Sequence, residues 1–293
     1  MSKHLSNLTF PSLLAIALMA SLFYVDAGHA GTTVHYGPVV GVGNGTVRTY
    51  LAVNAADKPV EFGVVMDRST LDGLPAEPNA TGRCFDLNGN GRIDGDSECE
   101  GDYEYVLALP TNIADRTDVP FQWITLDWNA HGHAPPGIYD LPHMDFHFYI
   151  ADEASVRAIK LGSCGFFIDC KDFERATQPV PAKYVDARHV SVGAAVGAMG
   201  NHLVDTTSPE LGKPPKKFTH TFIFGVYDGR ITFYEPMITR EYLLSQPVMC
   251  VPIKQPAAWQ LSGYYPTRYC VRYHEKADKY TVSLEGLKMR KAS

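Results

Sequence analysis

The sequence predicts a mainly β protein, built as an antiparallel β-barrel or a two-sheet sandwich with a few short helices. Segments rich in Val, Ile, Thr, Tyr and Phe recur along the chain, and Gly, Pro and Asp separate them, as expected of strands and turns. Helical signals are too few for a parallel sheet with crossover helices, and periodicity does not choose between barrel and sandwich. The predicted strands are residues 46–53, 60–66, 103–109, 121–128, 143–150, 218–226, 230–236, 269–273 and 279–284.

Local signals place one hairpin and two helices. Asp228-Gly229 favours a tight type I′ turn, so residues 218–236 are predicted to form one antiparallel unit. Aspartate and threonine are strong N-cap residues, because their side-chain oxygens accept hydrogen bonds from the first helical N–H groups. The predicted helices are residues 152–161, capped by Asp152, and residues 239–244, capped by Thr239.

Residues 1–30 resemble a signal peptide. A weakly basic start precedes an apolar run over residues 10–25, and small residues at Gly28 and Ala30 fit a cleavage site. The run is shorter than the ~20 residues that a membrane helix needs, so a retained anchor is the weaker alternative. We expect cleavage after Ala30, a secreted or periplasmic location, and no membrane span in the mature chain.

Composition limits the domain count and the partners. The formal net charge is −6 and no basic block occurs, which argues against nucleic acid and anionic membranes as partners. With 45% hydrophobic residues the chain can bury a full core, and all-β proteins of this length often form one domain. We therefore expect residues 31–293 to form a single β-rich domain.

All six cysteines lie beyond the predicted signal peptide and fall into three close pairs. Closure between nearest neighbours is the simplest arrangement for an oxidised, exported protein. None has the CxxC spacing typical of redox or zinc sites, so we interpret them as structural. The predicted disulfides are Cys84–Cys99, Cys164–Cys170 and Cys250–Cys270.

Residues 86–94 match the first nine positions of an EF-hand calcium loop. Oxygen-bearing side chains occupy positions one, three, five and nine, glycine occupies position six, and an apolar residue occupies position eight. Position twelve is Ser97 instead of glutamate, and the alternative is a solvated turn rich in Asn and Gly. A disulfide would close this calcium-like loop over residues 84–99. The predicted ligands of a structural Ca²⁺ are Asp86, Asn88, Asn90, the backbone carbonyl of Arg92, and Asp94.

The clearest chemical signal is the alternation of polar and apolar residues over residues 143–149. A strand there would put His143, Asp145, His147 and Tyr149 on one face and apolar side chains on the other. Residues two apart on a strand lie about 6.7 Å apart, whereas His143 and His147 would lie about 13 Å apart. One metal ion could therefore bind His143 with Asp145, or Asp145 with His147, but not easily both histidines.

Further candidate ligands lie outside this strand. His133 lies in a predicted loop, His202 lies in the segment Gly-Asn-His-Leu-Val-Asp over residues 200–205, and counting outward from the Asp-Gly turn makes His220 and Glu235 neighbours on paired strands. Histidine and carboxylate donors suit Zn²⁺, Cu²⁺, Fe²⁺ or Mn²⁺; the alternative for each histidine is a surface or core residue. The predicted transition-metal ligands are His133, His143, His147, His202 and His220, and the predicted catalytic residues are Asp145, Tyr149 and Glu235.

Three segments, residues 131–149, 200–202 and 227–239, together carry a resemblance. They include the runs Leu-Pro-His-Met-Asp-Phe-His-Phe-Tyr, Gly-Asn-His and Tyr-Asp-Gly-Arg-Ile-Thr-Phe-Tyr-Glu-Pro. The joined pattern resembles a family of secreted bacterial proteins classed as a domain of unknown function, which includes a ring-forming Thermus protein linked to an extracytoplasmic sigma-factor operon. The similarity covers about residues 46–244. It implies a β-rich fold and ring assembly, hence a homo-oligomer, but no reaction.

Several functions stay open at this point. The first is a secreted metal-binding protein that acts as a metalloenzyme, a hydrolase or an oxygenase, on a small-molecule substrate. The second is a non-catalytic envelope or ring-forming protein, stabilised by calcium and disulfides, whose histidines store metal or form a buried hydrogen-bond network. A small-ligand-binding barrel is a third, weaker alternative. Metal removal separates the first two, because loss of a structural ion unfolds a protein.

Overall fold

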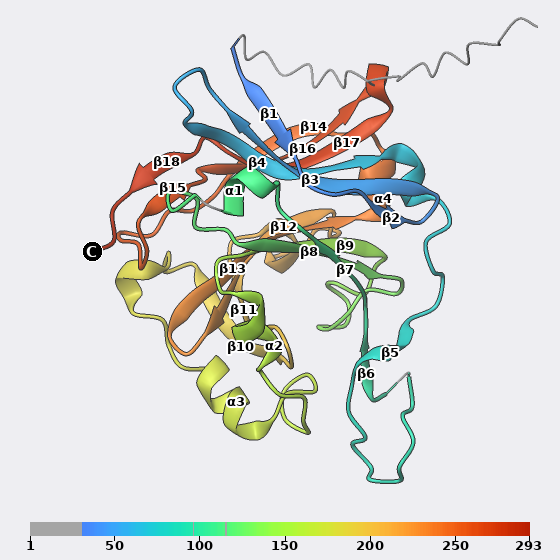
Figure 1. Ribbon diagram of the computed structural model, residues 1–293. Helices are drawn as coiled ribbons and strands as arrows, with labels where there is room; N and C mark the ends of the chain where they lie inside the picture. The colour runs from blue at the N-terminus through green and yellow to red at the C-terminus, as the bar shows by residue number, and fades with distance from the viewer. Residues whose placement is uncertain (1–30, 96, 115) are drawn as a thin grey trace, which may run out of the picture.

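Two antiparallel, seven-stranded sheets stack face to face (Figure 1). This computed structural model describes residues 31–95, 97–114 and 116–293, and the predicted signal peptide, residues 1–30, lies outside them. The two sheets are open and share no strand. The mainly β, antiparallel class is therefore confirmed, with the sandwich and not the barrel as its form.

Sheet I is the upper layer in Figure 1. Its strands run in the order β1-β3-β4-β17-β16-β14, and β2 pairs with β3. Strand β4 of the early β3–β4 hairpin pairs directly with β17. Residues from both ends of the described chain therefore lie side by side in this sheet. Its strands are β1 (Thr33–Tyr36), β2 (Val40–Val42), β3 (Gly45–Val53), β4 (Pro59–Asp67), β14 (Val248–Pro252), β16 (Arg268–His274) and β17 (Lys279–Glu285).

Sheet II is the lower layer and runs in the order β10-β11-β12-β13-β9-β8-β7. The strand with the alternating histidines, β9, lies between β13 and β8 near the middle of the sheet. Its strands are β7 (Tyr103–Leu107), β8 (Trp123–Asn129), β9 (His143–Tyr149), β10 (His189–Val196), β11 (Gly200–Asp205), β12 (His220–Tyr227) and β13 (Arg230–Thr239).

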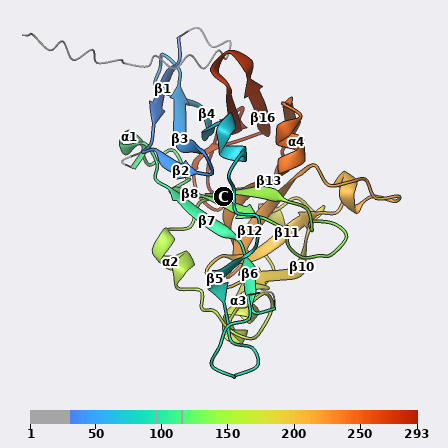
Figure 2. The same cartoon turned by 90° about the vertical axis from the view of Figure 1, so that its right-hand side faces the viewer.

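Smaller elements connect and flank the sheets. The ribbon of β5 (Asn79–Cys84) and β6 (Cys99–Gly101), with the loop between them, forms an arm that extends away from sheet II (Figures 1 and 2). A second ribbon pairs β15 (Gly263–Tyr265) with β18 (Lys288–Arg290). The helices are α1 (Thr111–Ala114), α2 (Glu153–Arg157), α3 (Cys170–Ala176) and α4 (Arg240–Leu244), with 3₁₀ turns at Arg68–Leu71, Ala182–Tyr184, Pro209–Leu211 and Glu275–Ala277.

The main core lies between the two sheets. On β9, Met144, Phe146 and Phe148 are fully buried in it, and the ring of Phe148 contacts Phe62 of sheet I. Each such side chain contributes roughly 1.5–3 kcal/mol by leaving water. Their burial fixes which way β9 faces, so the alternate residues must point to the outer face of sheet II.

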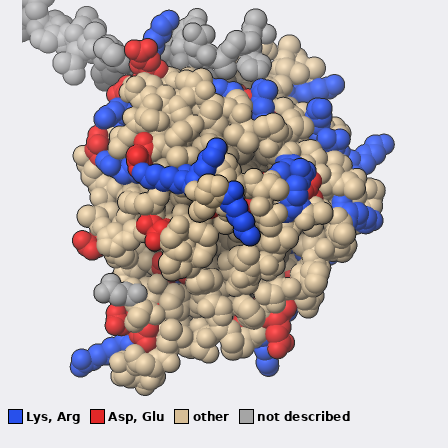
Figure 3. Space-filling view, turned by 180° about the vertical axis from the view of Figure 1, so that it is seen from behind, with Lys and Arg blue, Asp and Glu red and all other residues tan. Residues whose placement is uncertain are grey.

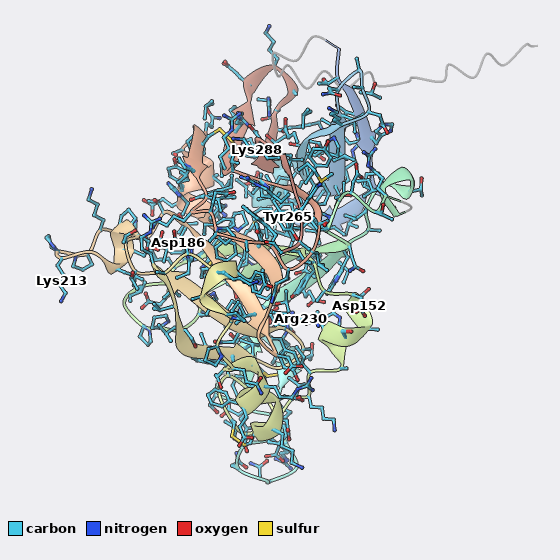
Figure 4. The ribbon with its side chains drawn as sticks, turned by 90° about the vertical axis from the view of Figure 1, so that its left-hand side faces the viewer. Asp152, Asp186, Lys213, Arg230, Tyr265 and Lys288 are labelled. Atoms are coloured by element: carbon cyan, nitrogen blue, oxygen red, sulfur yellow. A yellow bond between two sulfur atoms is a disulfide. The ribbon has the colours of Figure 1, made fainter. Side chains whose placement is uncertain are left out.

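The predicted strands all occur, with ends that differ by a few residues. Asp152 caps α2 by accepting a hydrogen bond from Ser155 N (Figure 4 labels Asp152), and Thr239 caps α4 through Tyr242 N. The helix after Asp152 is shorter than predicted. Strands β10 and β11 were not predicted, because Ser, Gly, Ala and Asn in them are weak strand formers.

The predicted turn between β12 and β13 is confirmed, but the predicted pairing further along the two strands is wrong. Asp228 and Gly229 have φ of 53° and 69°, as a type I′ turn requires, and Tyr227 pairs with Arg230. The register then shifts between Gly225 and Val226. Because a shift of one residue turns every later side chain to the other face, positions predicted beyond this bulge are displaced.

The three disulfides join the cysteines as predicted: Cys84 with Cys99, Cys164 with Cys170, and Cys250 with Cys270. The first closes the arm, and the third links paired positions of β14 and β16. Each lies within one local unit, so none ties sheet I to sheet II.

Charged side chains are dispersed over the surface seen in Figure 3. Lys and Arg stand mainly over its upper half, with uncharged surface between them, and Asp and Glu lie toward its left and lower edges. Among the described residues, no helix is long and apolar enough to cross a membrane.

Candidate metal centre

The outer face of sheet II carries polar side chains that are buried instead of solvated. On β9 these are His143, Asp145 and His147, each at most 4% exposed. Asp127 on β8 lies directly opposite Asp145 in the strand register. Glu235 lies on β13, which borders β9 on its other side. Both are also buried. Such groups cost free energy unless they are paired or bind a cation.

Asp127, Asp145, His147 and Glu235 line one cavity of about 50 Å³, which has room for a few water molecules or a small chemical group. Its polar wall comes from β8, β9, β13 and the arm. The rest of the lining includes the apolar side chains of Phe166, Val196 and Met199. The cavity therefore combines fixed donors with a surrounding of low dielectric, in which electrostatic interactions are strong.

The donors fall into two groups, which we call site A and site B. Site A consists of His133, His143 and Asp145, and site B consists of His147, His202 and Glu235. Within each group, one ligand atom from every residue lies within 4.8 Å of the others. Two histidines and one carboxylate also form the protein ligands of catalytic zinc and non-haem iron centres.

In site A, the carboxylate of Asp145 lies against two imidazoles. His133 Nε2 is 3.4 Å from Asp145 Oδ2, and His143 Nε2 is 3.2 Å from Oδ1. Asn129 Nδ2 donates a hydrogen bond to Oδ2 at 2.7 Å, which fixes the carboxylate. His143 and Asp145 thus form the pair that strand spacing allowed, and the loop residue His133 completes the group.

In site B, Glu235 lies against two further imidazoles. His147 Nε2 is 3.5 Å from Glu235 Oε1, and His202 Nε2 is 3.7 Å from Oε2. These distances are long for hydrogen bonds. Two ligand atoms bound to one tetrahedral Zn²⁺, each ~2.1 Å from the ion, lie about 3.4 Å from each other, which is close to both of these distances. The spacing therefore fits a metal ion better than direct pairing.

Backbone contacts fix the tautomers of three of these histidines. A carbonyl oxygen only accepts hydrogen bonds, so an Nδ1 beside one carries the proton, and the Nε2 of the neutral ring presents a lone pair. Metal-ligating histidines are commonly held in this way. The contacts are His133 Nδ1 to Ala134 O at 2.8 Å, His143 Nδ1 to Leu141 O at 2.6 Å, and His202 Nδ1 to Ala194 O at 2.7 Å.

Four buried ligand atoms have no hydrogen-bond partner: His143 Nε2, Asp145 Oδ1, His147 Nε2 and Glu235 Oε2. A buried polar atom without a partner costs about 1–3 kcal/mol, so a cluster of four requires an explanation. Two of them belong to site A and two to site B. A bound cation at each group would satisfy all four.

The two histidines of site B are in the protonation state that metal binding requires. Burial lowers the pKa of His202 to about 4 and lowers the pKa of His147 well below its usual value, so both rings are neutral near pH 7, as ligands must be. Burial raises the pKa of Glu235, and the charges of Asp145 and Asp127 raise it further. Glu235 thus shares the cavity with other negative groups and lacks a compensating cation among its contacts.

In site A, charge attraction dominates. Burial by itself would raise the pKa of Asp145, but the neighbouring His143 and His133 lower it below its usual range. Burial would lower the pKa of His133, yet its contact with Asp145 raises that pKa to about 9. In the apoprotein, the proton on His133 therefore supplies the positive charge that a metal ion would supply.

Several residues that support these groups were not predicted from the sequence. Arg83 on β5 is buried and forms ion pairs with Asp102, with Glu104, and with Asp127 at 3.4 Å. Asp127 Oδ2 is in turn 3.6 Å from His147 Nδ1. Alternation over β8, where Asp127 and Asn129 interrupt an apolar strand, is the sequence signal that could have revealed part of this set. No such signal marks Arg83.

Tyr149, predicted as catalytic, lies beside site B without joining it. Its ring stacks on Trp123 at 4.0 Å between centroids and lies 5.8 Å from the His147 ring. Its hydroxyl is buried and has no hydrogen-bond partner. Asp145 and Glu235, the other residues predicted as catalytic, lie within the ligand groups.

His220 lies outside the cluster, so its predicted pairing with Glu235 is wrong. The bulge moves His220 opposite Ile238, while Ile223 pairs with Glu235. His220 therefore points toward sheet I, where Nδ1 is 2.8 Å from Tyr269 Oη. One extra residue in β13 was enough to reverse its face.

The predicted calcium loop is held by its own side chains. Asp86 accepts hydrogen bonds from Asn90 N at 3.2 Å and Gly91 N at 2.7 Å. The buried carboxylate of Glu98, one position past Ser97, accepts from Leu87 N, Asn88 N and Asp94 N at 2.9–3.2 Å. Asp86 is half-buried, and the side chains of Asn88, Asn90, Arg92 and Asp94 are exposed.

A third cluster of candidate donors, formed by Cys250, Cys270 and Glu285, has a different explanation. The two cysteines form a disulfide, so they offer no thiolate, and Glu285 is paired with Arg272 and Arg268. This cluster is structural.

Comparisons of the chain with protein-family models, with curated proteins and with solved structures found no match.

Proposed function

We propose that this protein is an exported metalloenzyme whose transition-metal ion binds at site B, to His147, His202 and Glu235. The observation that carries the proposal is the pair of unpartnered buried atoms, His147 Nε2 and Glu235 Oε2, which face a cavity. Three protein ligands beside open space are typical of catalytic sites, whereas structural zinc sites are closed by a fourth ligand.

Each residue of site B has a separate task in this proposal. His202 and His147 bind through Nε2; a backbone carbonyl orients the first, and Thr125 and Asp127 orient the second. Glu235 supplies the negative charge. A bound divalent ion would supply Lewis-acid activation of water or dioxygen. The apolar side chains of the lining limit competing water and favour a substrate that has an apolar part.

Two reaction classes fit this centre: metal-assisted hydrolysis and oxygen chemistry. The donor set suits zinc hydrolases and non-haem iron oxygenases alike, and the apolar side chains of the cavity lining favour the second. Apoprotein reloaded with Zn²⁺ or with Fe²⁺ separates them: hydrolysis of neutral ester and amide substrates is expected with Zn²⁺, and substrate-dependent oxygen uptake with Fe²⁺.

The matched variants for this test are His202→Ala and His220→Ala. Both variants remove one half-buried imidazole from sheet II, but only the first removes a ligand of site B. Loss of one equivalent of bound Zn²⁺ in His202→Ala, with full retention in His220→Ala, is expected by inductively coupled plasma mass spectrometry. Wild-type protein that retains no transition metal after reloading would exclude the proposal.

We further propose that the loop over residues 84–99 binds a structural Ca²⁺ through Asp86, Asn88, Asn90, the carbonyl of Arg92, and Asp94. The order of oxygen donors supports it, as does the disulfide that closes the loop. Isothermal titration of Ca²⁺ against wild type and Asp86→Asn tests it. Equal heats from the two proteins would reject the site.

The remaining proposals concern location and assembly. Three disulfides are compatible with an oxidising compartment, so we propose a secreted or periplasmic protein that acts on a small molecule. Membership of the secreted bacterial family, with assembly into a ring, is proposed from the resemblance alone. Light scattering of the purified chain tests the assembly.

A further inference from the structure

We infer that the cavity holds two metal ions, one at site A and one at site B. This inference rests on the proposed function and deepens it, because a second ion changes how a substrate can be bound and activated. Site A is complete by itself: His133, His143 and Asp145 share no residue with site B.

The unpartnered atoms support two ions independently of the donor count. His143 Nε2 and Asp145 Oδ1 are buried and lack hydrogen-bond partners, although Asp145 is otherwise well supported by Asn129. An ion at site B would satisfy its own two orphaned atoms and leave these two unsatisfied. A second cation, at site A, would satisfy both.

The charge of the cavity lining also supports two metal ions. Its lining contains five carboxylates, on Glu100, Asp102, Asp127, Asp145 and Glu235, and one guanidinium, on Arg83. If all five carboxylates are ionised and the histidines are neutral, as metal ligands must be, the lining carries a formal excess of four negative charges. Burial of such an excess is compensated by protons or by cations. Two divalent ions would cancel it, whereas one would leave half of it.

The spacing allows the two ions to act on one substrate. Asp145 and His147 are two residues apart on β9, about 6.7 Å along the strand, and both line the cavity. A substrate group in the cavity could therefore contact both sites. The arrangement suits a small substrate with a polar group for the ions and an apolar part for the apolar side chains of the lining.

The test measures Zn²⁺ per chain after apoprotein is loaded with excess Zn²⁺ and desalted. We expect two equivalents in wild type, one in His143→Ala, one in His202→Ala, none in the double variant, and two in the control His220→Ala. Circular dichroism checks that each variant is folded. If His143→Ala does not fold, His133→Ala replaces it, since His133 lies in a loop and is 22% exposed.

The outcomes separate the two proposals. One equivalent in wild type that disappears in His202→Ala and survives in His143→Ala would overturn the second ion and leave the proposed function intact. No bound Zn²⁺ in wild type would overturn both. Mn²⁺ provides a second readout, because spin coupling between two ions in one cavity broadens the electron paramagnetic resonance signal, and this broadening should vanish in either single variant.

Discussion

The candidate metal centre depends on single hydrogen bonds that orient its donors. Asn129 is buried beside Asp145 and donates one hydrogen bond to its Oδ2, at 2.7 Å. Removing an outer hydrogen bond of this kind typically lowers metal affinity 10–100-fold. The donors themselves stay in place, so the effect should be confined to affinity.

We therefore predict that Asn129→Ala weakens Zn²⁺ binding at site A by about tenfold or more and leaves site B unchanged. Competition with a chelator of known affinity, in the His202→Ala background, measures site A alone. Unchanged affinity in this background would show that Asp145 needs no support from Asn129. The complementary measurement, in the His143→Ala background, should show no change.

A second prediction at the residue scale concerns His189, which lies away from the candidate centre on β10. Burial lowers its pKa to about 4, and Nδ1 has no hydrogen-bond partner. The ring therefore stays neutral in the folded protein, while it gains a proton near pH 6.5 in the unfolded chain. Between these values the unfolded state binds more protons, so folding stability falls as pH falls from about 6.5 to 4.

The variant His189→Gln cannot gain this proton. We expect its unfolding free energy to fall less steeply than that of wild type in this range, by up to about 1.4 kcal/mol per pH unit. Urea unfolding at several pH values measures both slopes. Parallel slopes would mean that His189 is not the group responsible.

At the scale of elements, the arm links the calcium-like loop to the candidate centre. Arg83 on β5 and Glu100 on β6 both reach the cavity, and the disulfide that closes the arm lies next to each of them in sequence. Arg83 also pairs with Asp127, which lies beside His147. Loosening the arm should therefore disturb site B.

We predict that replacing Cys84 and Cys99 together by serine lowers both stability and Zn²⁺ affinity. A loop of this size contributes about 3 kcal/mol through its disulfide, and part of that loss should appear as weaker binding. The matched control replaces Cys250 and Cys270, which join two strands of sheet I. That control should lose stability but keep its Zn²⁺ affinity; equal losses of affinity in both variants would reject the link.

The elements also show how far the sequence determines the structure. Alternation on β9, the Asp-Gly turn, two helix caps and three disulfides were predictable, because each depends on residues close together in the chain. The bulge near Gly225 was not, since nothing local marks the extra residue, and it moved His220 to the other face. Arg83 was missed because its role depends on contacts between distant segments, with Asp102 and Asp127.

For the molecule as a whole, fold and candidate centre are physically separate. The main core lies between the sheets, whereas sites A and B lie on the outer face of sheet II. Three disulfides further stabilise local units. The sandwich should therefore persist without metal, with reduced stability where four buried atoms lose their partner.

We predict that chelation lowers the melting temperature but leaves the far- and near-ultraviolet circular dichroism of the protein unchanged. Saturation of one site at a free Zn²⁺ concentration of 100 Kd contributes about 2.7 kcal/mol, which corresponds to roughly 5–10 °C for a chain of this size. Readdition of Zn²⁺ should restore the higher value in wild type and in His220→Ala, but not in a variant that lacks both His143 and His202. Loss of the near-ultraviolet signal on chelation would contradict a catalytic centre and support the alternative, in which the ions hold the envelope protein together.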